Sequence, residues 1–596
     1  MKQSLVLLCS AVLFGLTQGA AAATTITTAG EPVAHRQLEK IMQDYYEFNA
    51  RFNPVAATFF GDNRYDDQIG MSIAPKNSAR LYAQYHLFSK RLQQIDVAQL
   101  SEMDRTNDEI LSAELASALS LETFPDYLLP LNQMDSMPVN IANLASGESA
   151  QVITTPKQYR AFLNRVKQLP GWMKQAAANM RVGINTGVVL PQALTTSLLP
   201  QYQKLITDHP EDSIYYSPIR HFPATFSAQE KRRLTHDYHE VIAQQLTPAL
   251  KKFSTFLQNE YLPASRSTTG WGALPHGEGW YRAYVAAQTT TNMTPEQIHA
   301  IGLQEVARIQ QQFAQLGEKL GYTGAPAGLP AWVREQPQFY PFKSEQEILA
   351  AYEKLNASLD SKLPALFTLI PKAKLEVHPE PELTRATASA HYSPPSADGS
   401  RPGIFWAVIN DPTKYNSAGI TTLFLHEGRP GHHFQLALQQ ELPLPKFRRF
   451  GGNNAYIEGW ALYAESLGKE LGLYEDPLQA FGNLQLELLR SVRLVVDTGM
   501  HAKGWTREQS IKYMQDTLGF TPAEAKNATE RYMAWPGQAL GYKIGAMKIA
   551  ELRHRAELAL GDKFSLPEFH AVVIGEGSMP LSTLEAKVDQ MIAAKK

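Results

Sequence analysis

Apolar residues recur at helical spacing along most of this chain. Leu38, Ile41, Met42 and Tyr45 stand at positions i, i+3, i+4 and i+7, which is the spacing of residues on one face of an α-helix. The same kind of pattern dominates residues 33–130, including residues 108–121, and it returns in residues 155–183 and 228–262. This periodicity predicts a mainly α-helical protein.

Helix start signals support this interpretation further along the chain. Thr294 fits an N-cap, Pro295 the first helical turn and Gln297 the partner residue of a capping box, so a long helix should begin there. The next helix is expected to start near Glu345. Pro364 should interrupt or end it, because proline removes a backbone donor and clashes with the preceding turn.

Between residues 375 and 409 the pattern changes to short apolar runs separated by turns rich in Pro and Gly. The runs typical of strands are residues 375–377, 387–392 and 403–409, of which the last is the clearest. They predict a small β-sheet beside the helix that carries the candidate chemistry. An edge strand in that position can pair with an extended peptide through main-chain hydrogen bonds, although an ordinary small sheet explains the pattern equally well.

The N-terminus has the features of a secretory signal peptide. Lys2 precedes an apolar run over residues 5–16, and small residues over 19–23 predict cleavage near Ala22 or Ala23. Residues 1–23 are therefore assigned to the signal and residues 24–32 to a polar linker. The single cysteine of the chain, Cys9, lies inside the signal. A mature chain without thiols would have to bind any metal through histidine and carboxylate.

Composition and charge narrow the class of protein. The chain has 596 residues, of which 44% are hydrophobic, enough for a large core or for two to three subdomains. Its net charge is −2, so it lacks the basic surface that binds nucleic acid. No segment after the signal is long and apolar enough to span a membrane. Together with the signal peptide, this predicts a secreted or periplasmic protein. The sequence does not define its oligomeric state. We divide the chain into a helical scaffold, residues 33–270, and a catalytic region, residues 271–596.

The strongest chemical signal is a cluster of histidines around a helix break. An apolar helical segment carries His426 and Glu427 side by side, and a Gly-Arg-Pro-Gly sequence then separates them from His432 and His433. A zinc hydrolase needs about three protein ligands and one open position. In the usual helical motif, H-E-x-x-H, the Glu is the general base, but here the position four residues after His426 is Pro430.

The proline means that the local backbone must be distorted for this motif to bind one ion. On an unbroken helix the seven residues from His426 to His433 would span about 10.5 Å. Two imidazoles that bind the same zinc each lie only about 2.0–2.1 Å from it. A bulge or loop could bring either His432 or His433 back to the metal, and a helix end with surface histidines is the alternative.

A following helix, residues 455–471, supplies two carboxylates. Glu458 and Glu465 lie on roughly one face of it, two turns apart. Glu458 is the candidate third metal ligand, and Glu465 is the candidate partner that orients a ligand imidazole. A solvated acidic face is the alternative. It fits poorly, because Trp460 and Tyr463 between them indicate a buried helix.

Two further side chains are candidates for stabilising a tetrahedral intermediate. Tyr542 could donate its phenol to the developing oxyanion, and His501 could do the same, although core packing and a structural histidine are the respective alternatives. Gly545, close to Tyr542, should allow close approach of a neighbouring helix. Arg493, on the segment before His501, is interpreted together with Arg490 and Asp497 as part of a paired structural network.

Four motifs of the C-terminal half resemble the DUF885 family, whose members are regarded as zinc metallopeptidases with a mostly helical, thermolysin- and neurolysin-like core. They are His-Glu-Gly-Arg-Pro-Gly-His-His at 426–433, the Glu-Gly-Trp motif at 458–465, the segment 493–501, and Arg531-Tyr532 with Pro-Gly-Gln at 536–538 and its continuation to 545. Weaker likeness at 54–67 and around 277–308 extends the resemblance over nearly the whole mature chain. It implies a zinc peptidase of the His-Glu-plus-Glu type.

The combined expectation is an exported metallopeptidase that binds Zn²⁺ through His426, His432 and Glu458, with His433 as the substitute ligand or a substrate contact. Glu427 would be the general base that takes the proton of the attacking water. Tyr542, with His501 or Arg531, would stabilise the oxyanion. Two alternatives remain: a zinc hydrolase acting on a non-peptide amide or ester, and a non-catalytic periplasmic binding protein with a degenerate peptidase fold. The motifs do not choose between internal and terminal cleavage of a peptide substrate.

Overall fold

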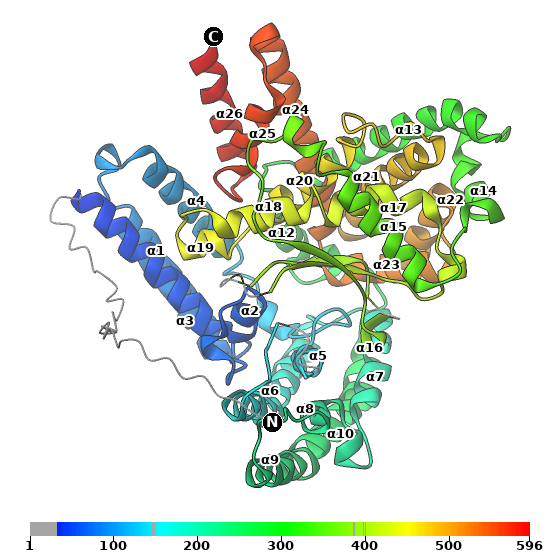
Figure 1. Ribbon diagram of the computed structural model, residues 1–596. Coiled ribbons are helices and arrows are strands. Elements are labelled where there is room, and N and C mark those ends of the chain that lie inside the picture. Colours follow the sequence, from blue (N-terminus) through cyan, green and yellow to red (C-terminus); the bar gives the residue numbers. More distant parts are fainter. Residues whose placement is uncertain (1–31, 146–149, 386–387, 397–398, 400) are drawn as a thin grey trace, which may run out of the picture.

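The computed structural model describes residues 32–145, 150–385, 388–396, 399 and 401–596. The predicted signal peptide and nearly all of the predicted linker lie outside these residues. Within them the protein is mainly helical with one small sheet, as expected (Figure 1). None of the helices in the described residues combines the length and the apolar character needed to cross a membrane.

The N-terminal helices pack into the same core as the C-terminal ones. Leu38 and Leu111 belong to a hydrophobic cluster that also contains Phe424, Trp460 and Val588. Packing therefore does not follow a division at residue 270. The N-terminal helices in this core are α1 (Val33–Phe52), α3 (Pro75–Leu92) and α4 (Glu102–Leu119). The short helix α2 (Pro54–Phe59) instead contributes Val55 to a different cluster, the one that contains Phe162.

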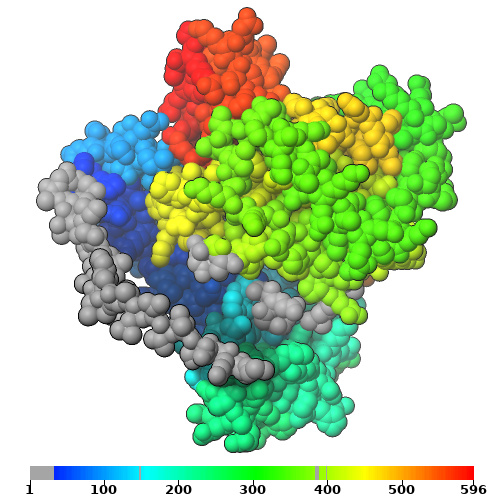
Figure 2. All heavy atoms as spheres, viewed as in Figure 1, coloured from blue at the N-terminus to red at the C-terminus, as the bar shows by residue number. Residues whose placement is uncertain are grey.

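A second group of helices forms a lobe at one end of the molecule (Figures 1 and 2). Its core is a separate hydrophobic cluster that includes Phe162, Trp172 and Tyr238. The helices are α5 (Met137–Leu144), α6 (Pro156–Thr186), α7 (Gln192–Leu205), α8 (Ser217–Arg220), α9 (Ala228–Val241), α10 (Thr247–Phe256) and α11 (Leu262–Ala264). The predicted helix 228–262 corresponds to α9–α11, joined by the π-helical turns Ile242–Leu246 and Leu257–Tyr261.

Along the chain, the lobe is followed by four helices that precede the sheet and the candidate site. They are α12 (Gly277–Thr289), α13 (Pro295–Leu320), α14 (Leu329–Arg334) and α15 (Glu345–Ser358). The capping box of Thr294 and Gln297 is present at the start of α13, which confirms the predicted helix start. Helix α15 begins at Glu345 as predicted and ends well before Pro364.

The sheet has three strands in the order β1-β3-β2: β1 (Leu375–Pro379), β2 (His391–Ser393) and β3 (Gly403–Ala407). Strands β1 and β3 are parallel, with Leu375 opposite Gly403, and β2 pairs with β3 in antiparallel orientation. The predicted strand 387–392 was wrong at its start, because residues 388–390 have no strand structure, and residue 387 lies outside the described residues. The sheet contacts the helix that begins at His432, as expected.

The remaining helices build the candidate site and its surroundings. They are α16 (Glu382–Arg385), α17 (Ile420–Glu427), α18 (His432–Glu441), α19 (Lys446–Arg449), α20 (Asn454–Ser466), α21 (Pro477–Lys503), α22 (Arg507–Leu518), α23 (Pro522–Ala534), α24 (Gly541–Leu560), α25 (Leu566–Ile574) and α26 (Leu581–Lys595). Helix α13 packs along α21, and α20 packs along α24.

Candidate metal centre

The helix break places His426 and His432 beside each other. Helix α17 ends at Glu427, and α18 starts at His432. Gly431 is required between them, because a Cβ atom there would lie 2.0 Å from the carbonyl oxygen of His426. The indole of Trp460 in α20 donates to the carbonyl of Pro430 over 2.9 Å and so holds the break against α20. As a result, the two imidazole ring centroids are 4.8 Å apart.

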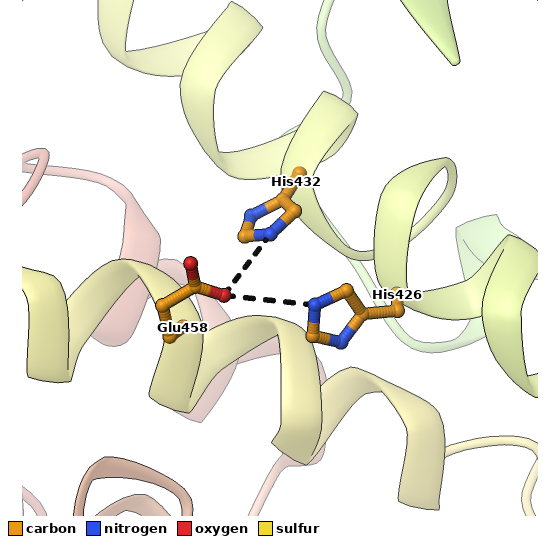
Figure 3. Close-up of side chains that lie close together, drawn as sticks. All are labelled: His426, His432 and Glu458. Carbon is orange, nitrogen blue, oxygen red and sulfur yellow. Dashed lines mark ion pairs between the residues drawn. The ribbon is translucent and has the colours of Figure 1, made fainter. Parts of the chain in front are cut away.

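Glu458 completes a cluster of three potential metal ligands. Its Oε2 atom lies 3.6 Å from His426 Nε2 and 3.3 Å from His432 Nε2, and both rings point toward it (Figure 3). All three ligand atoms lie within 4.8 Å of one another. Tetrahedral zinc with bonds of about 2.0–2.1 Å places its ligand atoms about 3.3 Å apart. The two distances from Glu458 are close to this value, and the widest pair of ligand atoms would have to close by up to about 1.5 Å to bind one ion.

The electrostatics of the cluster also fit a cation. Glu458 Oε2 is buried and has no hydrogen-bond partner among the described residues. Burial acts to raise the pKa of Glu458, but His432 and His426 outweigh it and hold that pKa well below its usual range. A buried carboxylate oxygen that faces two imidazole nitrogens is a suitable donor set for Zn²⁺.

Glu465 holds the outer nitrogen of His426. Its Oε1 atom is 2.8 Å from His426 Nδ1 and 3.1 Å from Arg490 Nη2. The Glu465 side chain is almost completely buried, at 1% exposed. A proton on Nδ1 shared with this carboxylate leaves Nε2 free to face Glu458 and a metal, so Glu465 can orient the His426 ring for metal binding.

Glu427, next to His426 at the end of α17, is buried in the same region. Burial raises the pKa of Glu427 to about 8; the His432 charge opposes this shift, and the Glu458 charge adds to it. A carboxyl group whose pKa lies near neutrality is suited to accept and return a proton.

Tyr542 brings α24 to the centre. Its ring is nearly parallel to that of His426, at a centroid distance of 6.2 Å. Arg531 Nη2 lies 3.5 Å from the Tyr542 hydroxyl. Burial raises the pKa of Tyr542, and so does the charge of Glu458, while the neighbouring arginines oppose the shift. The phenol therefore stays protonated and can donate a hydrogen bond.

His433, a candidate ligand, lies outside the ligand cluster, and His501, a candidate oxyanion donor, has both ring nitrogens on the backbone. His433 Nδ1 is 2.9 Å from the Tyr392 hydroxyl, and its Nε2 is 3.1 Å from the Ala373 carbonyl. His501 Nδ1 accepts from the Trp271 amide, and its Nε2 lies 3.0 Å from the Tyr532 carbonyl. Burial lowers the pKa of His433 to about 4 and that of His501 to about 3. Both imidazoles are neutral structural groups.

Arg493 lies close to the metal centre, whereas the sequence predicted that it would pair with Arg490 and Asp497. Its guanidinium carbon lies 4.5 Å from the centroid of the Tyr542 ring. The expected mutual network is wrong: Arg490 pairs with Glu465, and Asp497 accepts hydrogen bonds from Tyr281 and from the Gly537 amide. The sequence feature that indicates a special role for Arg493 is its position on a buried apolar helix face, where a charge needs a specific partner.

Two solved structures resemble this chain over nearly its whole length. A candidate lipoprotein from Colwellia psychrerythraea has 29% sequence identity and a TM-score of 0.88, and the match covers 94% of this chain and 100% of that one. A candidate lipoprotein of unknown function from Shewanella oneidensis has 19% identity and a TM-score of 0.72, with 92% and 99% covered, and it shows the shared fold alone. No curated protein matches the chain.

A family model, described as bacterial protein of unknown function (DUF885), matches residues 54–588. The match includes the helix break and Glu458, and it extends through α24. Because it spans most of the 596 residues, the chain belongs to the DUF885 family.

Proposed function

We propose that the protein is an exported zinc-dependent metallopeptidase. The observation that carries the proposal is the convergence of His426, His432 and Glu458, three ligand atoms within 4.8 Å of one another, beside the buried carboxyl group of Glu427. These three residues would hold Zn²⁺. When bound, the ion supplies Lewis acidity that makes water a nucleophile near neutral pH and polarises a carbonyl group.

Glu427 would carry the proton during hydrolysis. Its carboxylate takes a proton from the water that attacks the carbonyl carbon, and it returns that proton to the leaving amine as the C–N bond breaks.

Tyr542 would stabilise the oxyanion. Its protonated hydroxyl belongs to the helix that packs on the ligand-bearing α20, and its ring lies parallel to that of His426. A single well-placed donor of this kind contributes about 2.7–4 kcal/mol to the transition state. His501 has no place in this mechanism, since both of its nitrogens contact the backbone.

Two observations support export of the protein from the cytoplasm. Residues 1–23 have the pattern of a signal peptide, and the two similar structures are described as candidate lipoproteins. We further propose that the helical core belongs to the neurolysin- and thermolysin-like metallopeptidases, with the three-stranded sheet beside the metal helix.

The proposal is tested by zinc content and peptide turnover of the chain starting at residue 24. We expect about one zinc per chain in the wild type and in Glu427→Gln, and none in Glu458→Ala. A mass-spectrometric peptide library should be cleaved by the wild type. Turnover by Glu427→Gln should fall about 10²–10⁴-fold, because the general base is lost.

Glu353→Gln is the matched control, because Glu353 is an exposed glutamate on α15, and it should keep both zinc and turnover. Full activity of Glu427→Gln would disprove the general-base assignment. Zinc binding with hydrolysis of esters or non-peptide amides, but of no peptide, would replace the peptidase proposal by a different hydrolase. Absence of both zinc and turnover would favour a binding protein.

A further inference from the structure

Two arginines beside Tyr542 have no carboxylate partner among the described residues. Arg493, in α21, is only 9% exposed, yet it forms no ion pair within the described part of the chain. Arg531, near the end of α23, is half-buried and likewise forms none there. Arg490, one turn before Arg493, is paired with Glu465 at 3.1 Å. Arg490 therefore has a carboxylate in direct contact, whereas Arg493 is influenced by the charge of Glu458 without forming an ion pair with it.

The contacts of Arg493 leave donors unused. Its Nε donates to the Tyr532 hydroxyl over 3.1 Å, and its guanidinium stacks on the Tyr542 ring. Its Nη1 atom is buried without a hydrogen-bond partner in the described structure. Since an arginine stays charged at any physiological pH, a buried fork with an unused donor carries a substantial desolvation cost.

Arg531 approaches the same tyrosine from another helix. Its Nη2 atom lies 3.4 Å from Gln538 Oε1 and 3.5 Å from the Tyr542 hydroxyl, both at the outer limit of hydrogen bonding. Its Nε atom is buried and unpartnered among the described residues. Arg493 and Arg531 are thus two guanidinium groups in contact with one phenol.

This pair lies a short distance from the metal centre. The Tyr542 ring centroid is 6.2 Å from that of His426 and 4.5 Å from the guanidinium carbon of Arg493. Arg493 therefore lies within about 11 Å of the His426 ring, a distance that about three residues of extended peptide span at 3.3–3.6 Å each. A group held by the arginines would belong to a substrate whose scissile bond is a few residues away.

We propose that Arg493 and Arg531 bind the free C-terminal carboxylate of a peptide, so that the enzyme cleaves within about three residues of that end. This rests on the proposed peptidase function. Guanidinium forks match carboxylates by paired hydrogen bonds, and the bound carboxylate supplies the direct ion pair that neither arginine has among the described residues. The arginines are carboxylate-binding residues that determine which peptides are cleaved.

The test measures binding apart from turnover. Glu427→Gln protein loaded with zinc is titrated calorimetrically with one peptide in two forms, the free acid and the C-terminal amide. We expect the free acid to bind at least about 10-fold more tightly. In the same background, Arg531→Met and Arg493→Met should each remove most of this difference, and thermal melts establish that each variant is folded.

Arg531→Met keeps the test decisive if the buried Arg493 variant does not fold. The matched control is Arg334→Met, which removes a half-buried arginine already paired with Glu524 and should keep the preference. Equal binding of acid and amide, or a preference that survives Arg531→Met, would overturn the proposal. Equally tight binding of an amidated peptide ending in Asp would overturn the terminal assignment and make a side-chain carboxylate the ligand.

Turnover separates this proposal from the peptidase proposal. The wild type should cleave the free acid with a kcat/KM about 10-fold or more above that of the amide, and near the C-terminus. If zinc-loaded wild type binds the free acid tightly but does not cleave it, the peptidase proposal is disproved and the carboxylate-binding proposal is retained. If the wild type cleaves acid and amide equally at internal bonds, the carboxylate-binding proposal is disproved and the peptidase proposal is retained.

Discussion

At the scale of single residues, the candidate centre depends on side chains that hold other side chains. Glu465 is almost completely buried, and it contacts both the outer nitrogen of His426 and the guanidinium of Arg490. Its contact with Nδ1 keeps the His426 ring oriented. Such partners are therefore as important to metal binding as the ligands themselves.

Replacing Glu465 by glutamine tests this role. We expect Glu465→Gln to weaken zinc binding about 10–100-fold, because the charge that orients His426 is lost while the side-chain size is kept. Competition with a chelator measures the affinity. Glu475→Gln, an exposed site shortly after α20, serves as the control and should bind zinc like the wild type. Unchanged zinc affinity in Glu465→Gln would mean that His426 does not need this partner.

At the scale of elements, the crossing of α20 and α24 positions the centre. A Cβ atom on Gly545 would lie 1.8 Å from the Ala455 carbonyl oxygen, and one on Gly459 would lie 2.6 Å from the Gly545 backbone. Only glycine permits this approach. The crossing sets the position of Tyr542, on α24, relative to Glu458, on α20, and it confirms the close approach predicted for Gly545.

Substitution at the crossing should separate the two helices. We expect Gly545→Ala to lower the free energy of unfolding by about 1–3 kcal/mol through overpacking, and to reduce peptide turnover further because Tyr542 moves. Urea denaturation measures the first effect. Gly171→Ala in α6 is the control, since its Cβ would meet no atom within 4 Å; it should be neutral or stabilising by up to about 1 kcal/mol. Wild-type stability and turnover in Gly545→Ala would contradict this account.

At the scale of the whole molecule, helices far apart in sequence are joined by buried charges. Lys543 in α24 lies 2.8 Å from Glu305 in α13 and 2.6 Å from Glu487 in α21. Arg308 contacts both glutamates. Lys543 is only 4% exposed, so the loss of one charge from this cluster would leave others buried without a partner.

This cluster predicts a specific dependence of stability on pH. Burial acts to raise the pKa of Glu305, but Arg308 and Lys543 outweigh it and lower the pKa to about 2. A carboxyl group whose pKa is lower in the folded state stabilises the protein above its unfolded value, about 4.3, and loses that contribution as the pH falls toward 2.

We therefore expect Glu305→Gln to be less stable than the wild type at pH 7. The difference in unfolding free energy should shrink as the pH falls below about 4, because the unfolded chain then binds a proton at Glu305 that the folded protein, with its pKa near 2, does not bind. Thermal and urea unfolding between pH 7 and pH 3 measure it. A difference that grows on acidification would show that Glu305 is not ionised in the folded protein.

Local patterns predicted the elements and the types of the ligand residues. The periodicity over 155–183 corresponds to α6 (Pro156–Thr186), and the capping box at Thr294 begins α13. Residue type alone made His426, His432, His433 and Glu458 the candidate ligands, because imidazole and carboxylate are the groups that bind zinc in a chain without a mature cysteine. The prediction was wrong for less regular features, such as the start of β2, because no side-chain pattern there marks where strand pairing begins.

By itself, the sequence determined the helical class, the position of the helix break and the set of candidate ligands, since periodicity, capping and residue chemistry act within a few neighbouring residues. Only the tertiary structure decided that His432 and not His433 meets His426, because that choice depends on how the break packs against α20. It also placed Arg493 and Arg531 against Tyr542 and the N-terminal helices in the C-terminal core. These contacts join residues distant in the chain, and long-range packing is not encoded in local spacing.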